Sequence, residues 1–205
     1  MQHDFILLDR SGSMSSLWVE ALSSVNSYVK KLADDTVDTG VTLVTFDSDG
    51  GKSTFDIVRD RITPSTWAAV TNSDASPRGM TPLNDAIGKI VALAEKGMNG
   101  VPYEKLALII MTDGHENASV EFTFETAKAL LDKCRSKNWQ VIFLGANFDN
   151  SLQAKGYGNL RGQTISTSAV NLAQTMTETA SMRASYAATG AAMSYSEEQK
   201  ERLSK

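Results

Sequence analysis

The sequence predicts a single α/β domain, built as a doubly wound, mostly parallel, six-stranded sheet with helices on both faces in a Rossmann-like arrangement. The first observation is alternation: short apolar runs are separated by longer segments with helical periodicity along most of the chain. The second is that runs such as Phe5–Asp9 are continuously apolar, which is typical of strands buried on both faces of a parallel sheet. The third is size, because 205 residues with 41% hydrophobic content suit one globular domain.

The elements of the first half follow from these patterns. After the first strand, Ser16–Leu32 is predicted as a helix, because its apolar residues recur near helical spacing. Aspartates follow its end. Val41–Phe46 is predicted as the second strand. Ser53–Arg59 is expected to pair with it as a hairpin, because Gly50-Gly51 between them can adopt the positive φ angles of a tight turn.

The second half continues the alternation. Thr81–Glu95 is predicted as a helix, with Thr81 as its N-cap and Pro82 at its first position. The later elements are, in order, a strand Lys105–Thr112, a helix Phe124–Lys137, a strand Gln140–Gly145, a short helix near Asn150–Lys155, a strand Gln163–Ser166 and a helix Ser168–Thr189. The domain is expected to span residues 1–195, and the polar residues 196–205 are expected to form a frayed tail.

Oxygen-bearing side chains gather at three separated places. The first strand runs directly into Asp9-Arg10-Ser11-Gly12-Ser13, and the strand at 105–112 runs into Thr112-Asp113-Gly114. Between them lies Gly79-Met80-Thr81. In a doubly wound sheet the strand order reverses at the first strand, and ligands collect there outside the C-terminal strand ends. Carboxylate and hydroxyl oxygens suit a hard cation such as Mg²⁺ or Mn²⁺.

This combination resembles the von Willebrand factor type A family, whose metal-ion-dependent adhesion site is written D-x-S-x-S, then a threonine, then an aspartate in a T-D-G turn. The resemblance covers roughly residues 3–165 and thins beyond them. It implies that one Mg²⁺ or Mn²⁺ is held by Asp9, Ser11, Ser13, Thr81 and Asp113.

The same resemblance implies a function. In the family, the hydroxyls mostly bind the metal directly, one or both aspartates act through water, and an acidic residue of a protein partner fills an open coordination position. We therefore expect a divalent-cation-dependent adhesion or assembly module that binds a partner's glutamate or aspartate. A chain that consists of this domain alone is similar to the stand-alone bacterial or phage members of the family.

Other interpretations of the same residues remain open. Asp9 and Ser11 could simply cap a turn, and Asp113 could begin an Asx-turn. A phosphoester hydrolase would need a positioned nucleophile and base, and the chain has no phosphate loop, G-x-G-x-x-G or H-E-x-x-H motif, so an enzyme is not expected. A structural subunit could keep a metal that is vestigial or purely stabilising.

Composition narrows the partners and the location. The net charge of −4 predicts no basic patch for nucleic acid, and no stretch approaches the roughly 18 apolar residues of a membrane span. The first apolar run ends at Asp9, well short of the about 7 to 15 residues of a signal peptide, so we expect a cytoplasmic protein. The lone Cys134 excludes an intrachain disulfide and is expected to be buried and inert.

Two further segments and one histidine could be either structural or functional. His115-Glu116-Asn117 is expected to be a solvated loop on the rim of the crevice, although a base or a partner contact is the alternative. His3 is expected at the surface. The segment Ser168–Ala192 is expected to be the last helix of the domain, with self-association or partner docking as the alternative. Its small-residue face comprises Ala173, Ala180, Ala184, Ala187 and Ala188.

Overall fold

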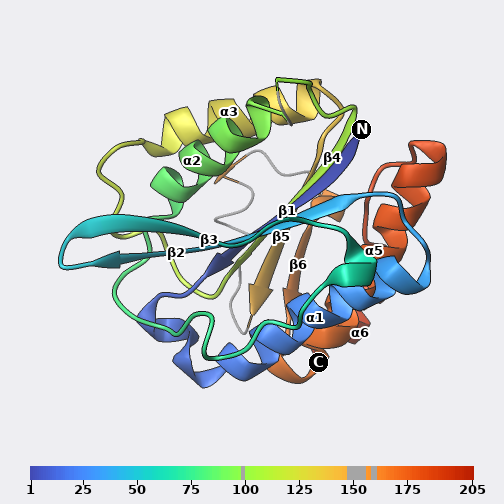
Figure 1. The fold of residues 1–205 in the computed structure, drawn as a ribbon. Coiled ribbons are helices and arrows are strands. Elements are labelled where there is room, and N and C mark those ends of the chain that lie inside the picture. The colour runs from blue at the N-terminus through green and yellow to red at the C-terminus, as the bar shows by residue number, and fades with distance from the viewer. Residues whose placement is uncertain (98–99, 147–155, 158–160) are drawn as a thin grey trace.

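The computed structural model describes residues 1–97, 100–146, 156–157 and 161–205. It confirms the predicted fold class, with one six-stranded sheet in the order β3-β2-β1-β4-β5-β6 (Figure 1). The strands are β1 (Gln2–Asp9), β2 (Gly40–Asp49), β3 (Lys52–Ile62), β4 (Lys105–Thr112), β5 (Gln140–Ala146) and β6 (Thr164–Thr167). Every neighbouring pair is parallel except β2 and β3.

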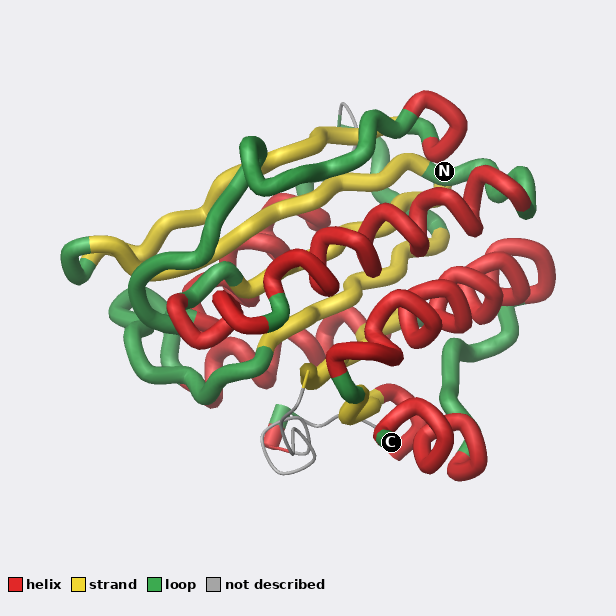
Figure 2. The backbone as a smooth tube through the Cα atoms, turned by 90° about the horizontal axis from the view of Figure 1, so that it is seen from below, coloured by secondary structure: helices red, strands yellow, loops and turns green. Residues whose placement is uncertain are grey.

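Helices cover both faces of this sheet (Figure 1). One face carries α2 (Leu83–Glu95) and α3 (Phe124–Ser136), and the other carries α1 (Trp18–Asp34), α5 (Leu172–Thr189) and α6 (Glu197–Ser204). The view from below shows α1 and α5 side by side over the strands (Figure 2). Because side chains of a strand alternate between faces, Ile6 and Leu8 of β1 enter one core while Phe5 and Leu7 enter the other.

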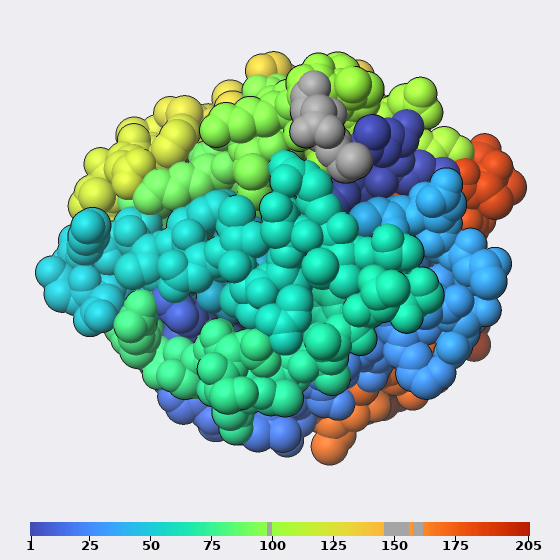
Figure 3. Space-filling model, in the orientation of Figure 1, coloured from blue at the N-terminus to red at the C-terminus, as the bar shows by residue number. Residues whose placement is uncertain are grey.

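The C-terminal ends of β1 and β4 meet at the point where the strand order reverses. Leu8 is paired with Met111, so Asp9 at the end of β1 stands beside Thr112 at the end of β4. On the other side, β2 runs past Phe46, the partner of Asp9, and turns back into β3 through Gly50-Gly51. Both glycines have positive φ, 58° and 77°, which confirms the predicted tight turn. The hairpin and the loop after it cover one face of the molecule (Figure 3).

Two predicted features near helix ends are wrong. The first residue of α2 is Leu83, with Pro82 at its N-cap position, and Thr81 makes no capping bond. Thr81 therefore lies in the loop before the helix. Residues 196–205 are not a frayed tail, because they contain α6, which begins with a reciprocal capping box between Ser196 and Gln199 and buries Leu203. The short helix expected near residues 150–155 falls outside the described residues.

The inward face of α5 differs from the predicted alanine face. Of the five alanines, Ala180 alone is buried, and the buried face is made by larger residues that include Arg183. Arg183 is fully buried and donates from Nε to Oδ1 of Asp4 in β1, and the hydroxyl of Tyr28 in α1 donates to Oδ2 of Asp4 at 3.0 Å. This buried ion pair makes α5 part of the domain core. None of the described helices is long and apolar enough to cross a membrane.

His3 and Cys134 are both buried. His3 was predicted at the surface, but its ring packs against those of Phe5 and Tyr103, and Nε2 is 2.9 Å from the hydroxyl of Thr42. Burial, helped by the charge of Arg61, lowers the pKa of His3 to about 3. Burial of Cys134 was predicted and is confirmed, and it raises the pKa of the thiol to about 11.

Candidate metal centre

Asp9 is held by two hydrogen bonds at the end of β1. Its side chain is buried, Oδ1 accepts the backbone N–H of Ser11 at 2.7 Å, and Oδ2 accepts the hydroxyl of Thr112 at 2.6 Å. The Thr112 contact is available because β1 and β4 are neighbouring parallel strands that end together. Both carboxylate oxygens are thus oriented by protein groups.

The two serines lie in a short 3₁₀ turn, η1 (Gly12–Ser16), directly after this carboxylate. The fully buried side chain of Met14 anchors the turn in the core. Ser11 Oγ lies 3.1 Å from Ser13 Oγ, and Ser13 Oγ donates to Oδ1 of Asp113 at 2.7 Å. A continuous line of contacts therefore joins the loop after β1 to the loop after β4.

Thr81 reaches the same place from the loop before α2. A methyl group built on Gly114 would lie 3.2 Å from Thr81 Oγ1, 3.4 Å from Ser13 Oγ and 4.0 Å from Asp9 Oδ2. Oxygens from three separate segments therefore lie within 4.0 Å of one point beside Gly114. The structure brings all five predicted residues together.

The chemistry of this donor set fits a hard divalent cation. Thr81 is 2% exposed, and within the described residues no hydrogen bond engages its hydroxyl. Burial raises the pKa of Asp9 to about 6 and also raises the pKa of Asp113, since no lysine or arginine of the described chain pairs with either carboxylate. A cation between them would favour their charged forms.

The hydroxyls are essential to this assignment. In the part of the chain that the structure describes, no group of three or more His, Cys, Asp and Glu residues could hold a metal ion by itself. A centre here depends on Ser11, Ser13 and Thr81 in addition to two carboxylates. Neutral hydroxyl oxygens suit magnesium or manganese far better than zinc, which prefers nitrogen and sulfur ligands.

An ion-pair network around the buried carboxylate of Asp47 supports the loop that carries Thr81, and the sequence did not predict it. Arg10 donates from Nε to Oδ1 of Asp47 at 3.0 Å, and Arg78 donates from Nε to Oδ2 of Asp47 at 2.8 Å. The backbone joins in, since Arg78 N donates to Arg10 O at 2.7 Å. Gly79 lies so close to Ser48 that an added Cβ would stand 1.8 Å from its carbonyl oxygen. Arg10 directly follows β1, whereas Asp47 lies in β2, and no motif or spacing in the sequence indicates that the two side chains meet.

The loop after Asp113 is also different from the prediction. Glu116 was expected in a solvated loop, but it is only partly exposed and accepts four hydrogen bonds from the loop and the start of α2. Asn117 is exposed, as expected, yet it is also bonded to the backbone of Thr81. His115 is exposed, as expected for the rim. The sequence carries no signal that separates a solvated polar loop from one whose side chains bind backbone amides.

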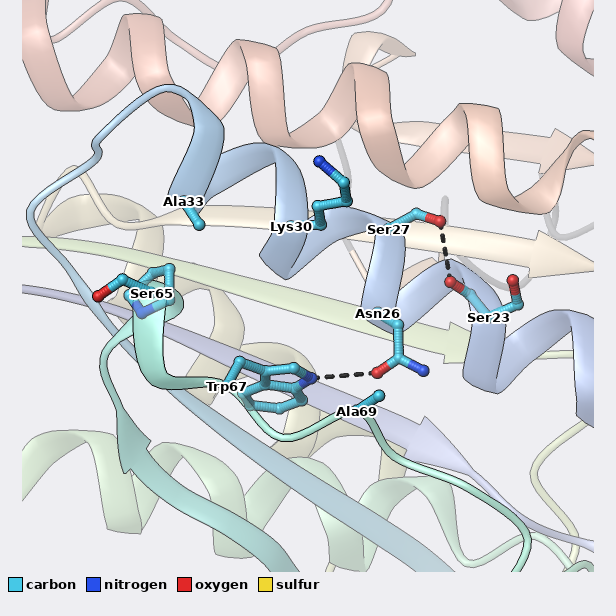
Figure 4. Close-up of a pocket in the computed structure, with 9 residues that line it drawn as sticks. Ser23, Asn26, Ser27, Lys30, Ala33, Ser65, Trp67 and Ala69 are labelled. Atoms are coloured by element: carbon cyan, nitrogen blue, oxygen red, sulfur yellow. Dashed lines mark hydrogen bonds between the residues drawn. The ribbon is translucent and has the colours of Figure 1, made fainter.

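A surface groove of about 400 Å³ lies elsewhere, between α1 and the segment after β3 (Figure 4). Its main polar groups are already bonded: Oδ1 of Asn26 accepts from Trp67 Nε1 at 3.1 Å, Nδ2 of Asn26 donates to Val70 O at 3.0 Å, and Lys30 pairs with Asp34. The groove shares no lining residue with the metal centre. The groove is therefore separate from the candidate metal centre.

Comparison with known proteins gives one family and one fold. The sequence profile of the von Willebrand factor type A domain matches residues 5–182, and no curated protein matches the sequence. The von Willebrand domain of the type V pilus tip protein Mfa5 from Porphyromonas gingivalis superposes with a TM-score of 0.67 at 12% identity, covering 96% of this chain and 97% of that one.

Two further solved structures share the fold. The pilus adhesin SpaC from Lactobacillus rhamnosus GG has a TM-score of 0.68 at 13% identity, with 88% of this chain covered but 30% of SpaC. The chain thus spans under a third of that adhesin. The manganese-loaded TRAP protein of Plasmodium vivax has a TM-score of 0.59 at 15% identity, with 85% and 71% covered.

Proposed function

Because the chain belongs to the von Willebrand factor type A domain family, we propose that it is a protein-binding module whose affinity for its partner depends on a bound divalent cation. The observation that carries this proposal is the convergence of Asp9, Ser13 and Thr81 oxygens on one point beside Gly114. Residues that cap separate turns have no reason to converge in this way. The site lies at the C-terminal strand ends, where open α/β sheets bind their ligands.

The five residues differ in how they can bind the metal, directly or through water. Ser11, Ser13 and Thr81 offer neutral hydroxyl oxygens as direct ligands. Asp9 already accepts hydrogen bonds at both oxygens, which suits a carboxylate that binds through water. Asp113 is partly exposed and sits beside Ser13, so it can bind directly or through water. When bound, Mg²⁺ or Mn²⁺ supplies a positive charge with an outward position for a partner's glutamate or aspartate.

The structural relatives support a binding role without identifying the partner. Two are described as a pilus adhesin and a pilus tip protein, and a third was solved loaded with manganese. For this chain, the acidic residue on the partner, the choice of magnesium or manganese and the cytoplasmic location stay predictions. So do the two alternatives, a phosphoester hydrolase and a structural subunit with a stabilising metal.

Affinity capture from an extract of the native host tests the proposal. The parent chain is used once with millimolar Mg²⁺ and once with chelator, alongside Thr81→Ala and the control Thr66→Ala, which alters an exposed threonine after β3. We expect a partner that binds the parent and Thr66→Ala in Mg²⁺, and that is weakened at least about tenfold, 1.4 kcal/mol, by chelator or by Thr81→Ala.

The alternatives give different results. Turnover of a phosphoester in Mg²⁺ that Asp113→Ala abolishes would favour the hydrolase. A partner that binds equally well in chelator and to Thr81→Ala would favour the structural subunit and move the interface off this crevice. The helix α5 is then the first surface to test.

A further inference from the structure

Asn117 holds the backbone of Thr81 from both sides. Thr81 N donates to the side-chain Oδ1 of Asn117 at 2.9 Å, and Asn117 N donates to Thr81 O at 3.1 Å. The two residues are 36 positions apart and come from different loops. One residue therefore bonds both polar backbone groups of a residue whose hydroxyl faces the metal centre.

Asn117 is itself held in place by the rest of its loop. Glu116 accepts from the backbone N–H of Asn84 at 2.8 Å through Oε2, and from Ala118 N and Ser119 N at 2.9 and 2.8 Å through Oε1. The hydroxyl of Ser119 accepts from Asp85 N at 3.0 Å. The backbone N–H groups of Asn84 and Asp85, which have no partner within the first turn of α2, are thus capped by side chains of a loop distant in sequence. These bonds hold the loop against the helix.

Asp85 completes the attachment from the helix side. Its buried carboxylate accepts the backbone N–H groups of residues 120, 121 and 122, at 3.0, 2.9 and 2.8 Å. The segment 113–122 therefore begins at Asp113 of the candidate metal centre and ends bonded to α2. Between these points, Asn117 makes its two hydrogen bonds to the backbone of Thr81, which together we call the clamp on Thr81. Any displacement of this loop moves Asp113 and Thr81 together.

We propose that Asn117 is a positioning residue of the metal centre, which sets the Thr81 hydroxyl at its distance from Asp113 and Ser13 without touching the metal. The proposal rests on the metal-dependent function proposed above. Its physical basis is that Thr81 has no helical hydrogen bond and no side-chain bond of its own in the described structure, so the clamp determines where its hydroxyl points. Partners that orient metal ligands in this way commonly contribute 10- to 100-fold, as an order of magnitude, to metal affinity.

The competing explanation is that Asn117 merely stabilises the loop. A stabilising residue changes the melting temperature of the metal-free protein and leaves the affinity of the folded protein for metal unchanged. A positioning residue lowers that affinity by more than the small change in metal-free stability explains. The two quantities are measured separately, by calorimetric titration with Mn²⁺ and by thermal melts in chelator.

The test compares Asn117→Ala with Asn117→Asp, which keeps the Oδ1 acceptor, and with the control Val120→Ala, whose side chain is 76% exposed in the same loop. We expect Asn117→Ala to bind Mn²⁺ at least about tenfold more weakly than the parent. Asn117→Asp and Val120→Ala should bind within about threefold of the parent or better. In metal-free protein, the Thr81 amide should exchange its hydrogen faster in Asn117→Ala than in Val120→Ala.

The proposal is overturned if Asn117→Ala binds Mn²⁺ like the parent, even when its Thr81 amide exchanges faster. It is also overturned if the Thr81 amide of the metal-free parent shows no protection, a measurement that needs no variant. Asn117→Gln, which displaces the acceptor by one methylene, replaces Asn117→Ala should the latter fail to fold. A parent that binds no Mn²⁺ at all would instead refute the proposed function, so the two failures are distinguishable.

Discussion

The hydroxyl of Ser13 donates a hydrogen bond to Oδ1 of Asp113 at 2.7 Å, across 100 positions of the sequence. The contact joins the loops after β1 and β4, which are neighbours because the strand order reverses at β1. Both side chains carry oxygen, and the oxygens of Thr81 and Asp9 lie around the same point.

Replacing Asp113 should remove the response of the protein to divalent ions. An ion that binds the native state alone stabilises it by RT ln(1 + [L]/Kd), about 2.7 kcal/mol at 100 times Kd. Thermal melts of the parent should therefore rise with millimolar Mg²⁺ or Mn²⁺, and melts of Asp113→Ala should not. A variant that responds like the parent would place the metal elsewhere.

Gly114→Ala should weaken metal binding although it replaces none of the five candidate ligands. Its φ lies outside the left-handed region, so alanine is tolerated by the backbone, but the methyl group would crowd Thr81 Oγ1 at 3.2 Å and Ser13 Oγ at 3.4 Å. We expect about a tenfold loss of Mn²⁺ affinity in a calorimetric titration, equal to about 1.4 kcal/mol. Gly12→Ala is the matched control, because its methyl group would meet Gly79 O at 3.4 Å and no ligand oxygen. Equal losses in both variants would show that crowding of Thr81 and Ser13 is not the cause.

Removing the metal should leave the fold intact. The sheet buries one apolar core on each face, and neither core includes a metal-centre residue. Far-ultraviolet circular dichroism should therefore be the same in chelator as in Mg²⁺ at room temperature. Collapse of the signal in chelator would mean that the ion is required for folding, as it is in a zinc finger.

His3 should make the protein less stable in acid. Its pKa is about 3 in the folded state, against an ordinary value of 6.5, so between these pH values the unfolded chain binds the extra proton. Stability should then be unaffected by His3 above pH 6.5 and fall below it, by up to about 1.4 kcal/mol per pH unit.

Denaturant unfolding of the parent and of His3→Gln between pH 7 and pH 4 checks this prediction. All other titrating groups are common to both proteins, so the difference between the two curves isolates the histidine. The parent should lose stability relative to His3→Gln as the pH falls. Parallel curves would show that His3 is protonated as readily in the folded protein as in the unfolded chain.

The fold was predictable because its strands are continuous apolar runs that end in polar residues. Asp9 and Asp113 could be assigned to neighbouring strand ends from that pattern together with the doubly wound topology. The burial of Arg183 was not predicted, because an arginine in a helical segment looks the same in the sequence whether its side chain faces solvent or the core. The helix at 197–204 was missed since one buried leucine, Leu203, in an otherwise polar segment carries almost no periodic signal.

The sequence predicted which side chains the structure brings together at the candidate site, but not the residues that hold them in place. The residues that supply oxygens stand in a recognisable spacing, whereas Glu116, Asn117 and Asp47 act through backbone amides and arginines that only the folded chain brings near them. A polar side chain in a loop has the same composition whether it binds water or an amide. That is why the hydrogen bonds of Glu116 and Asn117 were not predicted and Asp47 was not noticed.

Titration of the metal-free protein with Mn²⁺, followed by calorimetry, tests the central claim most directly. The parent and the control Thr66→Ala should each bind one ion per chain. Thr81→Ala, which removes one neutral hydroxyl from the site and leaves the net charge unchanged, should bind at least about tenfold more weakly, with the same melting temperature in chelator. A parent that binds no Mn²⁺ at millimolar concentration, or a Thr81→Ala variant that binds as tightly as the parent, would contradict the account.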